Sequence, residues 1–430
     1  MEVCRELLDL ANKCRESGHT LYVVGGYVRD SILGQPSNDI DICSDISYEE
    51  MTSICKSLKF KAIPVNKHLG TIHINTPAGV FEYTRLRRES YSNHGDHNPS
   101  EISFVNSIEE DVVRRDLTIN SVYYDICKDQ IVDIVDGLKD INKGIIRTPN
   151  SPDITFNDDG LRILRCIRFA STFNFRYARP TYLALQKYAC RLSRISKERI
   201  LEEIKQLVVC DLKHNIPNRI FLNSFDKLKL GKYVFNNTLD RLKKFSSKDK
   251  STFYSLPSEC RLVAFYILII RRYLIGYCKD NQLQFVINSL LGRDGIKESN
   301  NTQRTVHKLF KIIQNLNYLD DTLTASINYL TCSDAERKII ESYLTNKAKH
   351  ELSDNIYAIK INNIPLSANE LDITPDDIIS SGIEEKYISK ILTTLYNQVL
   401  SMKVKNKNSD LLELAINIHK TLSELSKEKK

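Results

Sequence analysis

The hydrophobic pattern changes once along this chain, and that change limits the folds open to it. Up to about residue 145, short β-branched runs bordered by turn residues alternate with helical patterns, whereas from about Phe156 onward apolar residues recur every three or four positions. The first pattern is typical of strands and the second of amphipathic helices. We therefore predict an α+β protein, with an α/β part followed by an all-helical one. The strand-type runs are LYVVGG, DIDIC, GTIHIN, VFEYTRL, SVYYDI and QIVDIVD.

Several shorter segments carry weaker signals. Residues 85–103 are polar and aperiodic, which predicts a mobile loop, and KKFSSKDKST (243–252) is also predicted to be a loop. The helical pattern is lost over residues 345–360. Thr374 followed by Pro375 predicts a helix start, because threonine caps and proline suits the first helical position.

Charge is distributed unevenly along the chain. At 430 residues it is long enough for two to four domains, and its formal net charge is +7. Residues 161–200 alone hold ten lysines and arginines against one acidic residue, Glu198, a local net charge of +9. This block predicts a polyanionic partner.

Cysteine usage and hydropathy bear on the compartment. The eleven cysteines show no CxxC and no paired spacing, which favours reduced thiols and a cytoplasmic protein. No export signal is evident at the N-terminus. The longest apolar stretch, Leu262 to Ile270, is far shorter than the ~20 residues of a membrane span, so we predict a buried helix there and no membrane partner.

Asp39 and Asp41 lie two positions apart in the strand-type run NDIDIC, so both carboxylates project from one face. Two such carboxylates suit hard divalent cations such as Mg²⁺. Glu82, in VFEYTRL, is a third candidate if its strand is a neighbour. Taken alone, the DxD string is more often a solvated strand, and Glu82 is equally compatible with a solvated position.

The strand LYVV runs into Gly25 and Gly26, and Arg29 follows in the next predicted helix. Two glycines let backbone N–H groups approach a phosphate, and Arg29 adds a charged donor. A plain tight turn is the alternative. The thirteen residues from Gly26 to Asp39 place both features close together.

The segment VVRRDLTINSVYYD contains a second group of candidates. Paired arginines can grip a triphosphate, and short polar side chains suit a ribose. The alternative is an exposed patch with local ion pairs. The candidates are Arg114, Arg115, Asp116 and Asn120.

The segment FNDDGLRILRCIRFA predicts a helix with Asp159 and Arg162 three residues apart on one face. Cytosine and adenine each present an amino donor beside a ring-nitrogen acceptor, so a carboxylate beside a guanidinium can select them against uracil and guanine. Arg165 and Arg168 continue at the same spacing toward the phosphates. The alternative is a salt bridge on a solvated basic face, but the next thirty residues offer few balancing acids.

These motifs together resemble the class II CCA-adding enzymes and their relatives, the bacterial poly(A) polymerases. The likeness rests on LYVVGGYVRDSILG, DID, RRDLTIN and DDGLRILRCIRF within residues 21–170, with SKERILEEIKQLV and the tail segments NNIPL, SGIEEKYISKIL and NSDLLELAI as weaker support. The resemblance implies a nucleotidyltransferase head followed by a helical neck, body and tail. We place their boundaries at residues 1–145, 146–214, 215–350 and 351–430.

The resemblance also implies roles. Asp39 and Asp41 resemble the Mg²⁺ ligands of a two-metal site, with Glu82 as the third carboxylate. In the head, the family's nucleotide contacts are matched by Gly26, Arg29 and Arg115. In the neck, the family's base-reading and phosphate-binding positions are matched by Asp159, Arg162, Arg165 and Arg168. The implied substrates are CTP, ATP and the 3′ end of tRNA, and no obligate protein partner is implied.

Three departures from the family pattern stand out. Asp158 takes the place of a glutamate, and Gly160 stands where alanine or proline is commoner. The loop after Arg87 reads HGDHNP instead of an Arg-His-Pro element, which puts terminal A addition in doubt. The segment DIVDG (133–137) replaces a DPFGG-like one.

The sequence favours complete CCA addition and leaves three alternatives open. Poly(A) addition and the addition of A alone use the same chemistry. The third alternative is a catalytically inactive RNA-binding protein that uses the basic neck as a phosphate track.

Overall fold

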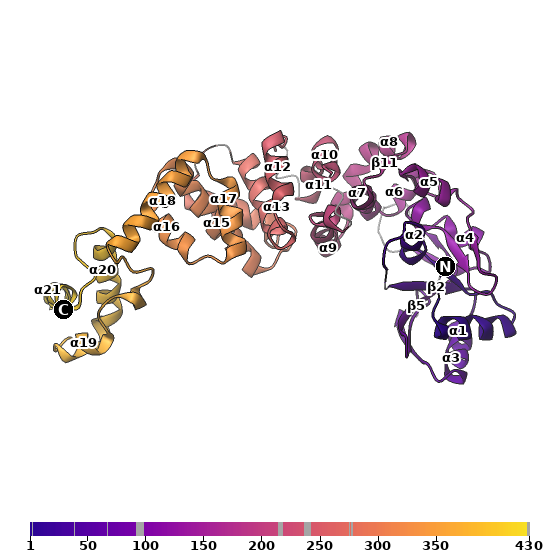
Figure 1. Ribbon diagram of the computed structural model, residues 1–430, viewed down its shortest axis with the longest axis horizontal. Coiled ribbons are helices and arrows are strands. Elements are labelled where there is room, and N and C mark those ends of the chain that lie inside the picture. Colours follow the sequence, from indigo (N-terminus) through magenta and orange to yellow (C-terminus); the bar gives the residue numbers. More distant parts are fainter. Residues whose placement is uncertain are drawn as a thin grey trace. The chain divides into compact units, whose positions relative to one another are not determined.

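The computed structural model describes residues 1, 3–37, 39–66, 68–91, 99–213, 218–235, 242–274, 276 and 278–427. By their contacts these residues form two compact units, Met1–Lys250 with Asn288–Glu298, and Ser251–Ile287 with Ser299–Lys430. Figure 1 labels their elements along the chain. The first unit holds every described strand and the second is helical. The predicted α+β class, with strands first and helices after, is therefore confirmed. The finer division into four domains stays a prediction.

A seven-stranded mixed sheet forms the N-terminal part of the first unit, with the strand order β3-β4-β5-β2-β1-β8-β9. Only the central pair, β2 with β5, is parallel, and all the other neighbours are antiparallel. The six predicted runs each contribute a strand, and β3 was not predicted. The strands are β1 (Tyr22–Val24), β2 (Ile40–Ser44), β3 (Lys61–Asn66), β4 (Thr71–Thr76), β5 (Gly79–Arg85), β8 (Tyr123–Asp125) and β9 (Gln130–Val132).

Three helices support this sheet. In Figure 1, α1 (Arg5–Glu16) and α3 (Tyr48–Ser57) lie side by side below β2, and they contact each other. Each presents buried apolar residues at helical spacing, among them Leu7 and Met51. The helix α2 (Gly26–Ile32) follows directly on β1.

The expectation of a loop over residues 85–103 was partly wrong. Its two ends pair as an antiparallel ribbon of β6 (Arg87–Ser90) and β7 (Glu101–Phe104). Arg87 fixes the start of this ribbon, because its guanidinium donates to the Leu69 carbonyl oxygen and pairs with Glu89. The segment HGDHNP that departs from the family pattern falls mostly on residues outside those described.

The rest of the first unit is helical, with one two-residue strand pair, β10 (Ile145–Ile146) and β11 (Arg176–Tyr177). The helices α7 and α9 pack on each other, as do α6 and α8. The helical elements are α4 (Ile108–Val112), η1 (Thr118–Asn120), α5 (Gly137–Lys143), α6 (Pro152–Asp158), α7 (Leu161–Phe173), α8 (Arg179–Tyr188), η2 (Ala189–Arg194), α9 (Lys197–Leu207), η3 (Cys210–Leu212), α10 (Ile220–Lys227) and α11 (Leu230–Val234).

Helices α12 (Ser247–Ser255) and α14 (Asp280–Leu291) carry the chain across the boundary of the two units. In the second unit α13 packs on α15 and α17, and α16 packs on α15 and α18. Its elements are α13 (Ser258–Tyr273), α15 (Asn300–Tyr318), α16 (Thr322–Leu330), α17 (Asp334–Tyr343), α18 (Asn346–Ile361), η4 (Ala368–Glu370), α19 (Pro375–Ser380), η5 (Glu385–Tyr387), α20 (Ile388–Leu400) and α21 (Asn408–Lys427).

Two helices contradict the sequence expectations. The predicted loop at 243–252 contains the start of α12, where Ser246 and Asp249 exchange hydrogen bonds across the first turn. Residues 346–361 form α18, which buries only Ala348, Leu352 and Ile359 along its length. So narrow an apolar face gives a weak periodic signal.

Other helical predictions are confirmed. The apolar stretch 262–270 lies within the largely buried α13. Thr374 caps α19 in a capping box with Asp377, and Pro375 takes the first helical position. No helix in the described part of the chain is both long enough and apolar enough to cross a membrane.

Gly137, at the start of α5, is placed where no larger residue fits. A Cβ there would come within 2.4 Å of the Thr118 carbonyl oxygen and 2.6 Å of a Val122 methyl group. Since Thr118 belongs to η1, this glycine lets α5 pack directly beneath the segment that carries Arg115, Asp116 and Asn120.

We therefore expect Gly137→Ala to destabilise the first unit by about 1–3 kcal/mol, because the added methyl group overpacks a backbone contact. The measurement is the midpoint of urea unfolding followed by circular dichroism. Lys139→Ala, an exposed change on the same helix, should stay within about 0.5 kcal/mol of the unchanged protein. Equal midpoints for both variants would contradict the packing argument.

Candidate active site

One cavity of about 1210 Å³ in the first unit gathers nearly all the residues singled out from the sequence. Its wall combines the ends of β1 and β2, helix α2, the segment before β8 and helix α7. Glu82 is the only candidate that does not line it. The candidates in the wall are Gly25, Gly26, Arg29, Asp39, Asp41, Arg114, Arg115, Asp116, Asn120, Asp159, Arg162, Arg165 and Arg168.

Asp39 and Asp41 stand at the start of β2, and Gly25 faces them from the end of β1. Gly25 has φ +82°, a conformation that L side chains rarely adopt, and a Cβ there would lie 3.2 Å from Asp41 Oδ2. Both the backbone conformation and the close approach therefore require glycine. The turn after β1 can therefore lie this close to the carboxylate of Asp41 because Gly25 has no side chain.

Glu82 occupies the position on β5 directly beside Asp41, because the two residues are register partners in the parallel pair. Its carboxylate lies 3.7 Å from His73 Nε2. Desolvation raises the pKa of Asp41 to about 6, and the negative charges of Glu82 and Asp39 add to this against Arg115 and Arg29.

The chemistry of this donor set fits a divalent cation. Two carboxylates open into the cavity with a third on the adjacent strand. Burial and, after it, the charges of Glu82 and Asp39 raise the pKa of Asp41, and a divalent cation would offset the repulsion between these carboxylates. Within the described residues no group of three or more histidine, cysteine, aspartate or glutamate side chains lies close enough together to hold a metal ion. Asp39 and Asp41 are two carboxylates that line the cavity here, and Glu82 is the register partner of Asp41 on β5.

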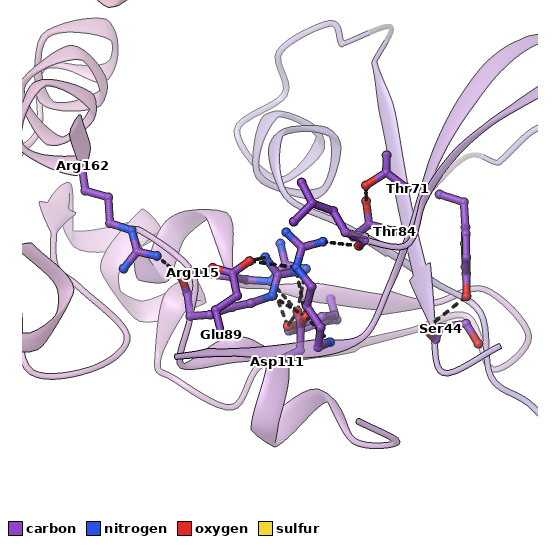
Figure 2. A network of polar contacts seen from close by, with 12 residues as sticks. Ser44, Thr71, Thr84, Glu89, Asp111, Arg115 and Arg162 are labelled. Atoms are coloured by element: carbon purple, nitrogen blue, oxygen red, sulfur yellow. Dashed lines mark hydrogen bonds and ion pairs between the residues drawn. The ribbon is translucent and has the colours of Figure 1, made fainter. Parts of the chain in front are cut away.

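Asp111, which the sequence reasoning missed, holds the paired arginines in place. Its side chain is fully buried and accepts from Arg114 Nε at 2.8 Å, Arg115 Nε at 2.9 Å and Tyr123 Oη at 2.9 Å. Burial alone would raise the pKa of Asp111, but Arg115 and Arg114 outweigh it and hold this pKa far below its ordinary value. Figure 2 shows Arg115 and Glu89 gathered about Asp111, with Arg162 reaching toward them.

A second chain of contacts joins α2, η1 and α7. Arg29 donates to Asn120 Oδ1, and Asn120 Nδ2 donates to Asp116 Oδ1 at 3.2 Å. Asp116 Oδ2 then accepts from Arg165 on α7 at 2.8 Å. The sequence predicted these residues as separate nucleotide contacts, whereas the structure joins them into one network along the cavity wall.

The predicted placement of Asp159 and Arg162 on one helix face is wrong. Asp159 lies between α6 and α7 in an extended conformation with φ −138° and ψ 108°, and only Arg162 is helical. Gly160 forms the break, and a Cβ there would lie 3.0 Å from the backbone of Arg191. The glycine therefore allows η2 to pack against the point where the chain turns.

Both side chains still enter the cavity, each held by neighbours. Asp159 Oδ1 accepts from the Leu161 amide at 2.9 Å and Oδ2 from Arg199 at 3.0 Å. Arg162 donates to the Arg114 carbonyl oxygen at 2.6 Å and to that of Thr155 at 3.3 Å. These contacts fix the orientation of a carboxylate and a guanidinium that line the same cavity.

The arginines of α7 are not a solvated basic face. Arg165 pairs with Asp116, and Arg168 pairs with the buried Glu203 of α9. The acids that balance this helix, Asp116 and Glu203, lie 49 and 35 positions along the chain from their arginines, so the sequence argument from missing local acids did not detect them. Of the residues that line the cavity, nine are lysine or arginine and six are aspartate or glutamate. The cavity is thus suited to a polyanionic ligand.

Of the residues that the sequence reasoning missed, Asp111 had a detectable local signal, whereas Arg199 and Glu203 did not. Asp111 precedes Arg114 and Arg115 by three and four positions, the spacing at which helical side chains meet. Arg199 and Glu203 lie 40 and 35 positions from their partners, so no local pattern could predict those contacts.

Comparison with known proteins gives consistent matches. Residues 21–147 match the Poly A polymerase head domain. A CCA-adding enzyme of Ligilactobacillus salivarius is 38% identical over 206 residues, which cover 48% of this chain and 49% of that protein, so the chain spans about half the length of this relative. A CCA-adding enzyme of Streptococcus mutans is 31% identical over 307 residues, covering 70% of this chain and 74% of the relative.

The fold also matches solved structures. The Thermotoga maritima CCA-adding enzyme complexed with tRNA aligns with a TM-score of 0.66 and 20% sequence identity over 97% of this chain and 96% of that one. At this identity the match establishes a shared fold.

The Asp116 network predicts how stability depends on pH. Burial alone would raise the pKa of Asp116, but Arg165 and a hydrogen bond from Asn120 outweigh it and lower this pKa to about 2. The carboxylate therefore stabilises the fold fully above the unfolded pKa of about 4, by ~2 kcal/mol, and the contribution is lost as pH falls toward 2. We expect the difference in unfolding free energy between the unchanged protein and Asp116→Asn to narrow by about 1 kcal/mol from pH 5 to pH 3. A difference that stays constant over this range would contradict the assignment.

Proposed function

This chain belongs to the CCA-adding enzyme family, and we propose that it adds C, C and A to the 3′ end of tRNA from CTP and ATP. The observation that carries the proposal is the shared cavity. A pair of carboxylates suited to a divalent cation, Asp39 and Asp41, opens into the same space as Asp159 and Arg162, which can read a base edge. A nucleoside triphosphate has a phosphate chain that would bind the cation and a base edge that would meet Asp159 and Arg162.

The reaction follows from the first group. The tRNA 3′-hydroxyl attacks the α-phosphorus, a new P–O bond forms, and the bond to the β-phosphate breaks with release of pyrophosphate. We propose that Asp39 and Asp41 would hold Mg²⁺, in a two-metal site with Glu82 as third carboxylate. The metal, when bound, would favour loss of the hydroxyl proton to solvent and would offset the charge of the leaving pyrophosphate. Arg29, Arg114 and Arg115 supply charged donors around the triphosphate, and Gly25 and Gly26 let it approach the backbone.

Base selection follows from the second group. A carboxylate has about four acceptor positions and a guanidinium has five N–H donors, so the contacts that orient Asp159 and Arg162 leave capacity for a ligand. Asp159 would accept from the exocyclic amino group of cytosine or adenine while Arg162 donates to the ring nitrogen. Uracil and guanine present a carbonyl oxygen and an N–H there, so each would meet a group of the same polarity.

In this proposal the helical parts of the protein supply the surface that binds the tRNA. The basic block 161–200 and the helices of the second unit would follow the tRNA, as the family relationship suggests. We place the reaction in the cytoplasm, which agrees with eleven cysteines that are all free thiols.

The test uses tRNA transcripts that lack the CCA end, incubated with the full-length protein and Mg²⁺. CTP alone should give two added cytidines, ATP alone should give none, and both together should give CCA. EDTA should stop incorporation and excess Mg²⁺ should restore it. Long A tails on any RNA would instead support poly(A) addition, A added only to tRNA that already ends in CC would support an A-adding enzyme, and no incorporation at all would overturn catalysis.

A division of labour between the two groups is also expected. Asp39→Ala should abolish transfer, because one of the two carboxylates that hold the cation is lost. Arg162→Ala should retain slow transfer but admit UTP and GTP, with at least a tenfold loss of preference for CTP and ATP, since one bidentate base contact accounts for roughly 1–3 kcal/mol of discrimination. Incorporation of each nucleotide is measured separately on the same tRNA. Arg5→Ala, which removes an exposed arginine at the start of α1 that lies outside both the cavity and the basic block, is the control. Equal loss of all activity in the Asp39 and Arg162 variants would refute this division.

A further inference from the structure

One aromatic ring lies against three of the arginines that line the cavity. Phe169, on α7, is 8% exposed, and its ring centroid is 4.4 Å from the guanidinium carbon of Arg168, 5.1 Å from that of Arg29 and 5.6 Å from that of Arg165. The face of an aromatic ring carries partial negative charge and attracts a cation within about 6 Å. All four side chains also line the cavity.

The three arginines come from two separate parts of the fold. Arg29 belongs to α2, directly after β1, whereas Arg165 and Arg168 belong to α7. Each arginine has its own carboxylate partner, and these partners are Asp30, Asp116 and Glu203 respectively. Among the residues that the structure describes, the ring of Phe169 contacts all three arginines, whereas their carboxylate partners differ.

A second ring supports the same contact. Phe173 stacks parallel to Phe169, with an interplanar angle of 1° and centroids 6.3 Å apart, and its centroid is 4.8 Å from the guanidinium carbon of Arg29. Arg29 is only 4% exposed, and burial lowers its pKa even though Asp30 opposes this. Two aromatic rings therefore surround a guanidinium that has lost most of its hydration.

Three positive charges within a few ångströms of one point repel one another, and carboxylates alone would draw them apart toward their separate partners. A shared ring offsets this repulsion without adding a negative charge that would repel a polyphosphate. Such contacts are stronger where the cation is desolvated, as Arg29 is.

We propose that Phe169 is a positioning residue that holds Arg29, Arg165 and Arg168 together as one binding surface for the triphosphate of the incoming nucleotide. This inference rests on the proposed function, because it assigns the polyphosphate end of the same cavity. It also predicts that the contribution of Phe169 is independent of the base, since its ring lies against Arg29, Arg165 and Arg168, whereas the base-reading Arg162 lies over the ring of Tyr91.

The first test measures KM and kcat for CTP and for ATP with Phe169→Leu. Leucine keeps the site apolar but removes the ring. We expect KM to rise about tenfold for both nucleotides, corresponding to the loss of cation–π contacts, with kcat within about threefold of the unchanged protein and the choice of C and A retained. Phe169→Tyr, which keeps the ring, should restore KM.

Phe175→Leu is the matched control. Phe175 follows the same helix and contacts the Phe173 ring at 5.5 Å, but within the described residues it has no cation partner. It should leave KM unchanged. Equal increases in KM for the Phe175 and Phe169 variants, or failure of Phe169→Tyr to restore KM, would show that Phe169 acts through packing and would overturn the proposal.

A second measurement does not depend on transfer. Binding of inorganic tripolyphosphate to the full-length protein is measured by calorimetry for the unchanged protein and for protein with singly, doubly and triply fluorinated phenylalanine at position 169. Fluorination withdraws charge from the ring face while nearly keeping its shape, so affinity should fall stepwise with each fluorine. Equal affinities across the series would overturn the proposal even if Phe169→Leu does not fold. The affinity for tripolyphosphate could fall stepwise across the fluorinated series while the unchanged protein adds no nucleotides to tRNA. In that case the proposed function fails and the assignment of Phe169 stands.

Discussion

Crowding of guanidinium groups into one cavity is the constraint on which the candidate site depends. A site that binds a triphosphate needs several positive charges close together, yet burying them uncompensated would be costly. In this protein, buried carboxylates form ion pairs with the arginines that line the cavity. Asp111 behind Arg114 and Arg115 is fully buried, and Glu203 behind Arg168 nearly so. Each acid neutralises part of the charge and fixes one edge of an arginine, while the cavity lining as a whole keeps an excess of positive groups.

The same arrangement explains why the sequence indicated the residues of the candidate site but not the contacts that hold them in place. The strand carrying Asp39 and Asp41, the glycine turn and the arginine spacing of α7 are local patterns, and thirteen of the fourteen candidate residues line one cavity. Glu82 lies beside Asp41 only because β2 and β5 pair in parallel, a long-range register that the order of strands does not reveal. Partners such as Glu203 come from other helices, so no pattern around Arg168 points to them.

The errors in secondary structure have similar causes. Helix α18 buries a narrow apolar face, and α12 begins in a run of serine and lysine that resembles a loop, so both depend on packing and end contacts more than on periodicity. Asp159 was placed on a helix because the pattern DDGLR continues into one. Asp159 instead follows the end of α6, and Gly160 precedes α7 and admits the backbone of Arg191. This close approach cannot be read from the identity of the residue alone. The change of hydrophobic pattern between about residue 145 and Phe156 still gave the correct fold class, because it depends on long periodic segments and not on individual boundaries.

The break at Gly160 has a chemical advantage over a continuous helix. On a helix, Asp159 and Arg162 would be adjacent on one face and would pair with each other, which would satisfy the groups intended for a base. Between two helices, Asp159 is held instead by the Leu161 amide and by Arg199, and Arg162 is held by backbone carbonyl oxygens. Each side chain is thereby oriented by partners other than the opposite member of the pair. A carboxylate and a guanidinium held in this way keep free positions with which each can engage a different edge atom of the same base, as the proposed base reading needs.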